Sequence, residues 1–193
     1  KSNTAMLAGA NLSRANLSHA NLRKVELRGS NLQEANLSRA DMRGTDFHAS
    51  NMCRCVAHNA LFIKANMREV MLCDADVRDS HLNDANLVKA NLHDTDFTSR
   101  QPEGFTVLNL ANLEGADLTG AKMHSVSAED ANFRNANLTG VDLRHAVLGG
   151  AILRRANVTD ANFEDVELAT VTMDFANFSK AKNAKIPSYK TNL

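Results

Sequence analysis

The chain has 193 residues, of which 44% are apolar and only 5% aromatic, and its 22 basic residues balance 22 acidic ones. This balance argues against a protein whose whole surface binds or mimics nucleic acid, and no apolar run approaches the roughly 20 residues that span a bilayer. Three cysteines do not make a disulfide framework in a chain of this length. Because the apolar residues are mainly Ala and Leu, we expect a narrow and repetitive core.

A five-residue unit repeats along almost the whole chain, from residue 7 to 97 and again from 108 to 178. Each unit has a small residue, then Asn or Asp in most copies, then a large apolar centre, then two mostly polar residues, as in residues 10–14. We call these positions i−2, i−1, i, i+1 and i+2. In all 34 units, position i−2 is Ala, Val, Ser, Thr or Cys, so the pattern is not accidental.

A period of five residues fits neither regular element. On a helix the apolar centres would spiral around every face, and on a flat strand they would alternate between the two faces. The chain must therefore turn once per unit, with positions i−2 and i pointing inward. Such turns close into coils that stack about 4.8 Å apart. Asn and Asp at i−1 suit the corner because their side chains bond nearby backbone and tolerate turns.

The unit resembles the repeat of the pentapeptide repeat family. Residues 10–12, 35–37, 116–118 and 136–138 match its Ala-(Asp/Asn)-Leu consensus, and the repeat covers about 88% of the chain. The resemblance implies an all-β fold, a right-handed quadrilateral parallel β-helix with four units, hence 20 residues, per coil. On that basis the chain forms about nine coils.

The repeat pattern divides the chain into a long repetitive part and a short C-terminal segment. Residues 1–180 are expected to form a single β-helix, with a loop and a one-residue register shift at 98–107, where the centres lie eleven residues apart instead of ten. This loop is either a defect without consequence or a contact for a partner. Residues 181–193 are expected to form a C-terminal cap or tail. No cap precedes Ala5, so we expect the natural protein to continue beyond Lys1.

Cysteine and histidine occur 20 residues apart, at Cys53, Cys73 and His93, with Asp74 and Asp94 beside them. The residue types resemble a metal-ligand set, but groups about 4.8 Å apart suit neither a single metal ion nor the roughly 3.8 Å between Cβ atoms of a disulfide. A metal site, a disulfide and a column of reduced cysteines stay open, and we favour the last. Cys55 occupies an inward position and is interpreted as core.

Charge is distributed in bands. Residues 1–64 carry a net charge of +5, residues 65–130 of −7, and residues 131–193 of +2. If successive units lie on successive faces, Asp74, Asp79 and Asp84 encircle the rod, and Asp94 stacks above Asp74. The band either serves solubility or docks a partner. The candidate contact residues are Asp74, Asp79, Asp84 and Asp94, together with Arg100, Gln101, Pro102 and Glu103 of the loop.

No nucleophile, phosphate-loop or zinc-protease motif occurs, and a tight solenoid has no interior cavity. We therefore expect no enzyme, cofactor or metal. The preferred hypothesis is a scaffold that binds another protein, with no direct nucleic-acid contact and no membrane span, as part of a longer protein such as a bacterial effector. It would be cytoplasmic, or secreted into a host cell. Its oligomeric state stays open, with an end-to-end dimer as one option. The alternative implied by the resemblance is a DNA mimic that binds DNA gyrase or topoisomerase and protects it from quinolones.

Overall fold

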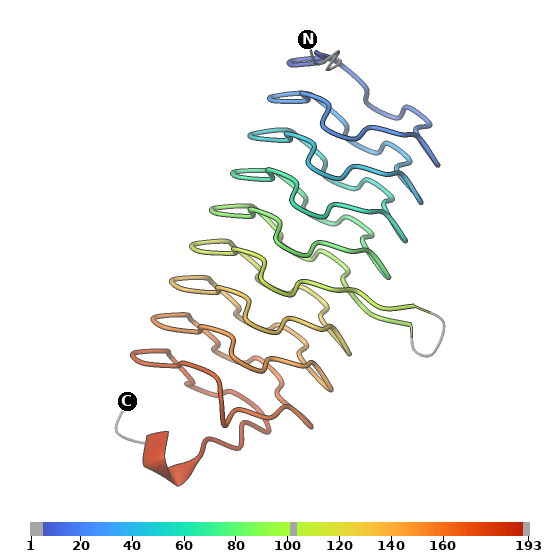
Figure 1. Cartoon of the computed structure of the whole chain (residues 1–193). Coiled ribbons are helices and arrows are strands. Elements are labelled where there is room, and N and C mark those ends of the chain that lie inside the picture. Colours follow the sequence, from blue (N-terminus) through green and yellow to red (C-terminus); the bar gives the residue numbers. More distant parts are fainter. Residues whose placement is uncertain (1–5, 101–103, 191–193) are drawn as a thin grey trace.

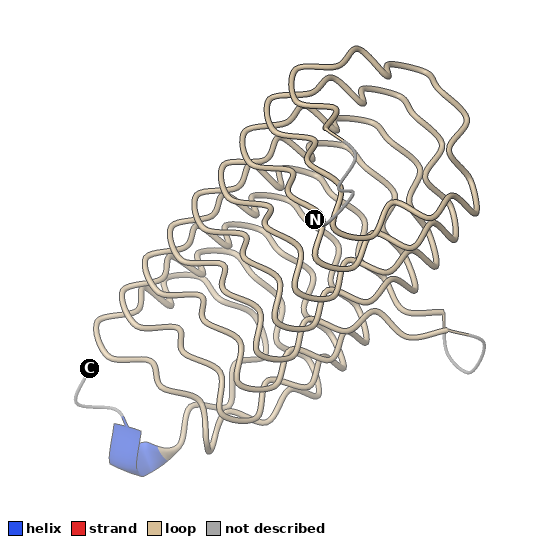
Figure 2. Cartoon of the chain, turned by 45° about the horizontal axis from the view of Figure 1, so that its top comes forward, coloured by secondary structure: helices blue, strands red, loops and turns tan. Residues whose placement is uncertain are grey.

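The chain winds as a stack of similar coils along one axis, with its two termini at opposite ends (Figure 1). This computed structural model describes residues 6–100 and 104–190. Turns and short extended segments make up every coil (Figure 2), and the one helical element of the described residues is the 3₁₀ helix η1, Ser188–Lys190. No helix among them has the length and apolar character needed to cross a membrane.

Parallel bridges between single residues hold neighbouring coils together. Outside the coil that contains the insertion, each bridge joins two i−1 residues that lie 20 positions apart, as Asn11 and Asn31 do, so one coil contains four units. In a typical unit the amide of the centre donates to the next coil and the amide at i−1 donates to the preceding one. The amide of Leu12 donates to Asn31 (2.7 Å), and that of Asn31 donates to Ala10 (2.9 Å). The backbone is thus paired from coil to coil without long strands.

The corners lie at positions i+1 and i+2. Except for Ser99 and Thr170, the described non-glycine residues at i+2 have φ between 53° and 62°, the left-handed region that glycine enters at least cost. The Asn or Asp at i−1 lies on the flat side before the corner, and the prediction that it occupies the corner itself is wrong. Its side chain reaches forward and accepts the i+1 amide, as Asn36 Oδ1 accepts from Ser38 at 3.1 Å. The residue preference is therefore a turn cap made from one position earlier.

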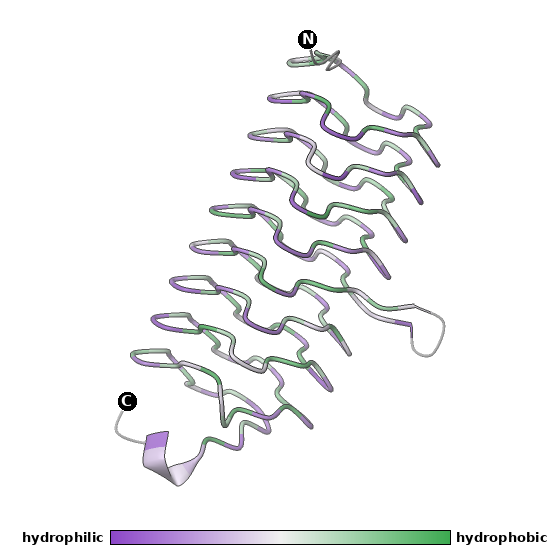
Figure 3. Cartoon of the chain, in the orientation of Figure 1, coloured by the Kyte–Doolittle hydropathy of each residue, from purple (hydrophilic) through white to green (hydrophobic). Residues whose placement is uncertain are grey.

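Positions i−2 and i fill the interior, which accounts for the alternation of apolar and polar residues along each coil in Figure 3. Larger centres are tolerated: Phe47, Phe62 and Phe97 are fully buried, and the rings of Phe47 and Phe62 lie edge to face at 6.0 Å. Ala57, the small centre just before Phe62, is also fully buried. The core is thus a continuous column of Ala and larger side chains.

The interruption of the repeat is an insertion at one corner. Ser99 occupies an i+2 position and Thr106 the next i−2 position, so residues 100–105 are additional. Bridges across this coil join residues 26 apart, such as His81 and Val107. The described segments on either side of residues 101–103 project from the side of the stack (Figure 1). The expected one-residue register shift is thus a six-residue insertion, and no unit of the coil is lost.

The C-terminal end is closed by η1. The Tyr189 hydroxyl donates to the carbonyl of Ala169 (3.2 Å), and the Lys190 ammonium donates to those of Leu168 (3.3 Å) and Val171 (2.5 Å). The last bridge of the ladder joins Asn162 and Lys182. Side chains of the cap thus pair carbonyls of the final coil that have no further coil to bond.

Candidate protein-contact surface

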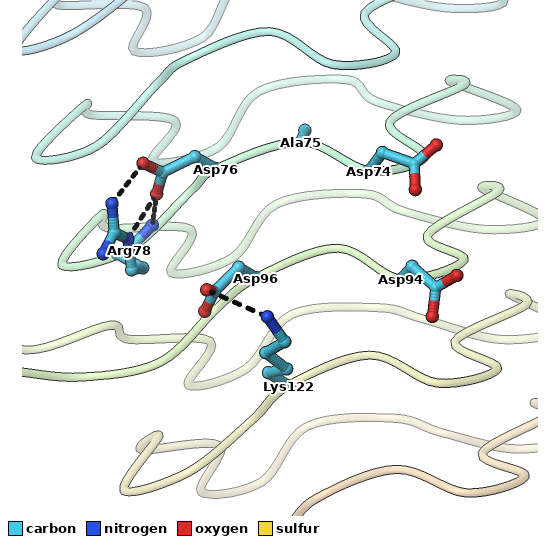
Figure 4. A pocket seen from close by; sticks show the side chains of 7 residues that line it. All are labelled: Asp74, Ala75, Asp76, Arg78, Asp94, Asp96 and Lys122. Carbon is cyan, nitrogen blue, oxygen red and sulfur yellow. Dashed lines mark hydrogen bonds and ion pairs between the residues drawn. The ribbon is translucent and has the colours of Figure 1, made fainter.

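A depression of about 540 Å³ lies on the acidic part of the rod (Figure 4). It spans neighbouring coils on the side that follows the Asp74 corner. Four carboxylates and two basic side chains line it, which leaves an excess of two negative charges. Its lining residues are Asp74, Ala75, Asp76, Arg78, Asp94, Asp96 and Lys122.

The repeat places Asp74 and Asp94 one above the other at the same corner, and both are exposed. Figure 4 shows them at one edge of the depression, away from the paired side chains. Asp94 contacts His93, whose Nε2 lies 2.9 Å from Oδ2. Asp74 makes no ion pair among the described residues. The expected stacking of Asp94 above Asp74 is therefore present, and it sets like charges at neighbouring coil positions.

The same corner column is neutralised near the N-terminal end. Glu34 lies between Arg14 and Arg54, and each guanidinium approaches its carboxylate at 2.9 Å. The hydrogen bond from Arg14, followed by that from Arg54, lowers the pKa of Glu34 below its usual value. One column thus changes from alternating charges to successive carboxylates at Asp74 and Asp94.

The opposite edge of the depression is held by internal pairs. Arg78 donates to both oxygens of Asp76 at 2.8 and 2.6 Å, and Lys122 lies 3.8 Å from Asp96. Partial burial raises the pKa of Asp76, but the hydrogen bonds from the Arg78 side chain and backbone outweigh this effect and lower it overall. The sequence analysis did not single out Asp76 and Asp96, although both are acidic i−1 residues 20 positions apart.

The structure contradicts the expected exposure of Asp79. Asp79 is only 6% exposed, because Arg100 and Gly104, at the two ends of the inserted loop, lie against its side chain. The Arg100 amide and Nε each donate to its carboxylate at 2.9 Å. Asp79 is therefore the anchor of the loop and not a docking charge.

The other predicted contact residues are separate from the depression. Asp84 is exposed at a different corner and makes no ion pair among the described residues. Arg100 is exposed but engaged with Asp79. Gln101, Pro102 and Glu103 lie outside the described residues. Of the predicted set, the structure brings Asp74 and Asp94 together at the depression, and it pairs Asp79 with Arg100 at the base of the loop.

The column of reduced cysteines was the wrong alternative. Cys53 and Cys73 form a disulfide with their Cα atoms 4.6 Å apart, within the range that disulfides accept. The coil spacing fixes the distance between backbones, whereas the side chains lean toward each other. Cys55 is a buried free thiol, and burial raises its pKa to about 12. Among the described residues, no three His, Cys, Asp or Glu side chains are grouped to hold a metal ion.

One known protein family matches this chain along its repeats. The model of pentapeptide repeats matches in 8 copies, which fall on residues 10–48, 40–79, 65–99, 105–135, 131–168 and 151–182. The chain belongs to the pentapeptide repeat family. Proteins of this family are in general interaction or structural proteins and not enzymes. No curated protein sequence matches the chain significantly.

Solved pentapeptide repeat proteins are similar along most of the chain. QnrB1, a plasmid-mediated fluoroquinolone resistance protein, is 17% identical, with 98% of this chain and 94% of QnrB1 covered and a TM-score of 0.58. HetL of Nostoc sp. strain PCC 7120, involved in heterocyst differentiation regulation, is 28% identical over 92% of this chain and 84% of HetL, with a TM-score of 0.42. The likeness to QnrB1 supports the fold.

Proposed function

We propose that this pentapeptide repeat protein is a non-enzymatic rod that binds another protein through the acidic depression, with Asp74 and Asp94 as its free charges. The carrying observation is that neither carboxylate pairs with a Lys or Arg side chain among the described residues, and Asp94 pairs only with His93, whereas Glu34 in the same column pairs with an Arg on both sides. A lysine- or arginine-rich segment of a partner would supply the missing charge.

The scaffold suits such contact because the backbone bonds from coil to coil hold the side chains at a fixed spacing. Stacked carboxylates about 4.8 Å apart repel each other, and a cation between them relieves the repulsion. Exposed charges are screened over about 8 Å at physiological ionic strength, so binding should weaken as salt increases.

Quantitative affinity capture tests the proposal. The wild type and a variant carrying Asp74→Asn and Asp94→Asn are compared, with Asp84→Asn as an exposed control that also removes negative charge. We expect the double variant to lose its partner at physiological salt and the control to retain it. Equal recovery of the same partner by all three proteins would remove the depression from the function.

A topoisomerase is the second candidate partner. The fold of QnrB1 and the acidic band favour it, although both flanking segments are basic. A DNA gyrase supercoiling assay with a fluoroquinolone tests this role, and the absence of both inhibition and protection would eliminate it.

Three finer expectations stay predictions beside this function. They are the right-handed winding, the number of about nine coils, and membership of a larger bacterial effector. Electron microscopy of the purified natural protein would test the first two, and translocation of a reporter fusion into host cells would test the third.

A further inference from the structure

The hydrogen-bonded ladder also opens away from the insertion, between the units at 146–150 and 166–170. The preceding bridge on this side joins Ser127 and Val147, but no bridge joins Val147 to Glu167. Within residues 6–100 and 104–190, the amides of Leu148 and Glu167 donate to no backbone carbonyl, unlike their equivalents in the preceding coils. The two coils are therefore separated here although both still enclose the apolar core, in which Leu148 and Leu168 stay buried.

The opening is part of the architecture of the C-terminal end. The Gly150 amide donates to the hydroxyl of Thr170 at 3.1 Å. In a regular unit the amide at i+2 donates to an i+1 carbonyl of the next coil, which here would be that of Ala169. That carbonyl accepts instead from the hydroxyl of Tyr189 in η1. The side chains of Thr170 and Tyr189 thus hold the edge of the last coil away from the ladder.

A pocket of about 260 Å³ occupies the opening. Small or apolar residues line it, and Val147 among them is 50% exposed. Two carboxylates, Asp165 and Glu167, also line it, with His145 Nδ1 3.4 Å from Asp165 Oδ2. The remaining lining residues are Ala146, Leu148, Gly149, Ala169 and Thr170.

We propose that this pocket binds an arginine side chain presented by a partner protein. Its methylene groups would pack on Val147 and Ala169, as the stems of long cationic side chains do on apolar surface. The carbonyls of Ala146 and Glu167, which accept no hydrogen bond among the described residues, and the two carboxylates supply acceptors for a guanidinium. A guanidinium supplies five donors in a fixed plane, which a lysine ammonium does not.

The pocket is distinct from the acidic depression. It lies on the side that carries Val147 and Glu167 at the C-terminal end, whereas Asp74 and Asp94 are in the middle of the chain. The proposal does not rest on the function assigned to the depression, and either site can fail a test without the other.

Amide NMR with short blocked peptides tests the pocket on the intact chain. A Gly-Arg-Gly peptide is titrated into ¹⁵N-labelled protein, and a peptide with citrulline, the uncharged isostere of arginine, is the control ligand. We expect saturable shifts confined to the signals of Gly149, Gly150, Ala169 and Thr170. We also expect the citrulline peptide to bind at least tenfold more weakly.

Two variants locate the interaction. Glu167→Gln removes charge without changing shape and should weaken arginine binding several-fold, and Ala169→Leu should fill the pocket and abolish it. Asp160→Asn, a carboxylate at another corner, should bind like the wild type. Equal binding of both peptides, shifts elsewhere on the rod, or unchanged affinity in Glu167→Gln would each overturn the proposal, even if Ala169→Leu fails to fold.

Discussion

Asp79 and Arg100 form an ion pair, with Nε 2.9 Å from Oδ2, that fixes the base of the inserted loop to the coil below it. The backbone amide of Arg100 donates to the other oxygen of the same carboxylate. Thr106, where the coil resumes, accepts the Asp79 amide through its hydroxyl at 2.7 Å. Its own amide donates to the hydroxyl of Ser99 at 2.8 Å. Side chains thus replace the ladder where the insertion interrupts it.

Replacing Asp79 with Ala should destabilise the loop and the coil beneath it. The variant loses two hydrogen bonds to a charged group, so the free energy of unfolding should fall by about 2 kcal/mol. Trypsin should also cleave after Arg100 faster than in the wild type. The matched control is Asp84→Ala, an exposed carboxylate without an ion pair, which should change stability by less than about 0.5 kcal/mol. Equal effects of the two substitutions in urea unfolding would contradict the role of Asp79.

The disulfide between Cys53 and Cys73 should stabilise two successive coils. It closes a loop of 20 residues, and its loss should lower the free energy of unfolding by about 3 kcal/mol. Cys53→Ser together with Cys73→Ser tests this by denaturant unfolding.

Alkylation followed by mass spectrometry provides an independent check on the three cysteines. The native protein should react at none of them, since Cys55 is buried and its pKa is raised to about 12. The protein unfolded without a reductant should react at Cys55 alone. Modification of Cys53 or Cys73 under that condition would show that the disulfide is absent.

Gly140 and Gly149 should respond differently to alanine. Gly140 has φ of +69° with open space around the place of a Cβ atom, so only backbone strain opposes substitution. We expect Gly140→Ala to cost about 1–2 kcal/mol. Gly149 lies outside the left-handed region, and an added Cβ would make ordinary contacts, so Gly149→Ala should be neutral or stabilising by up to about 1 kcal/mol. Similar thermal midpoints for both variants would refute the left-handed corner as the cause.

Three Asp–Arg pairs should make the free energy of unfolding decrease at low pH. Arg43, Arg78 and Arg144 each donate Nε to the Asp two residues earlier at 2.8 Å. The pKa values of these carboxyls are lowered overall. A lowered pKa in the folded state gives stability that is present above the unfolded value and lost as pH falls through the folded one.

Unfolding measured between about pH 5 and pH 2 tests this contribution. As the pH falls below the ordinary pKa of a carboxyl group, the free energy of unfolding should decrease more steeply in the wild type than in Arg78→Gln, in which Asp76 has no cationic partner. Parallel curves for the two proteins would show that the Asp76–Arg78 pair does not contribute.

The five-residue period was sufficient to predict the coils because every coil obeys the same local rule: small and large apolar residues inward, and polar residues at the turns. The burial of Asp79 was not accessible in this way, since it depends on where an irregular segment folds. The repeat could align Cys53 with Cys73, but the spacing between backbones did not show that their side chains meet.

The contact surface was predictable only in part for the same reason. Aligning residues 20 positions apart correctly predicted that Asp94 stacks on Asp74. The same alignment at position i−1 would have identified Asp76 and Asp96 as neighbouring carboxylates. The missing pairing of Val147 with Glu167 follows from the cap at the end of the chain, which no repeat pattern describes.

Site-specific photo-crosslinking tests the central claim, that the acidic depression contacts a protein, most directly. A photoreactive residue is placed at His93, beside Asp94, and as control at Ser179, an exposed position of the same column. The account predicts a crosslinked partner from position 93, none from position 179, and loss of the adduct when Asp74 and Asp94 are both replaced by Asn. Equal crosslinking from both positions, or an adduct at position 93 that persists without the two carboxylates, would contradict it.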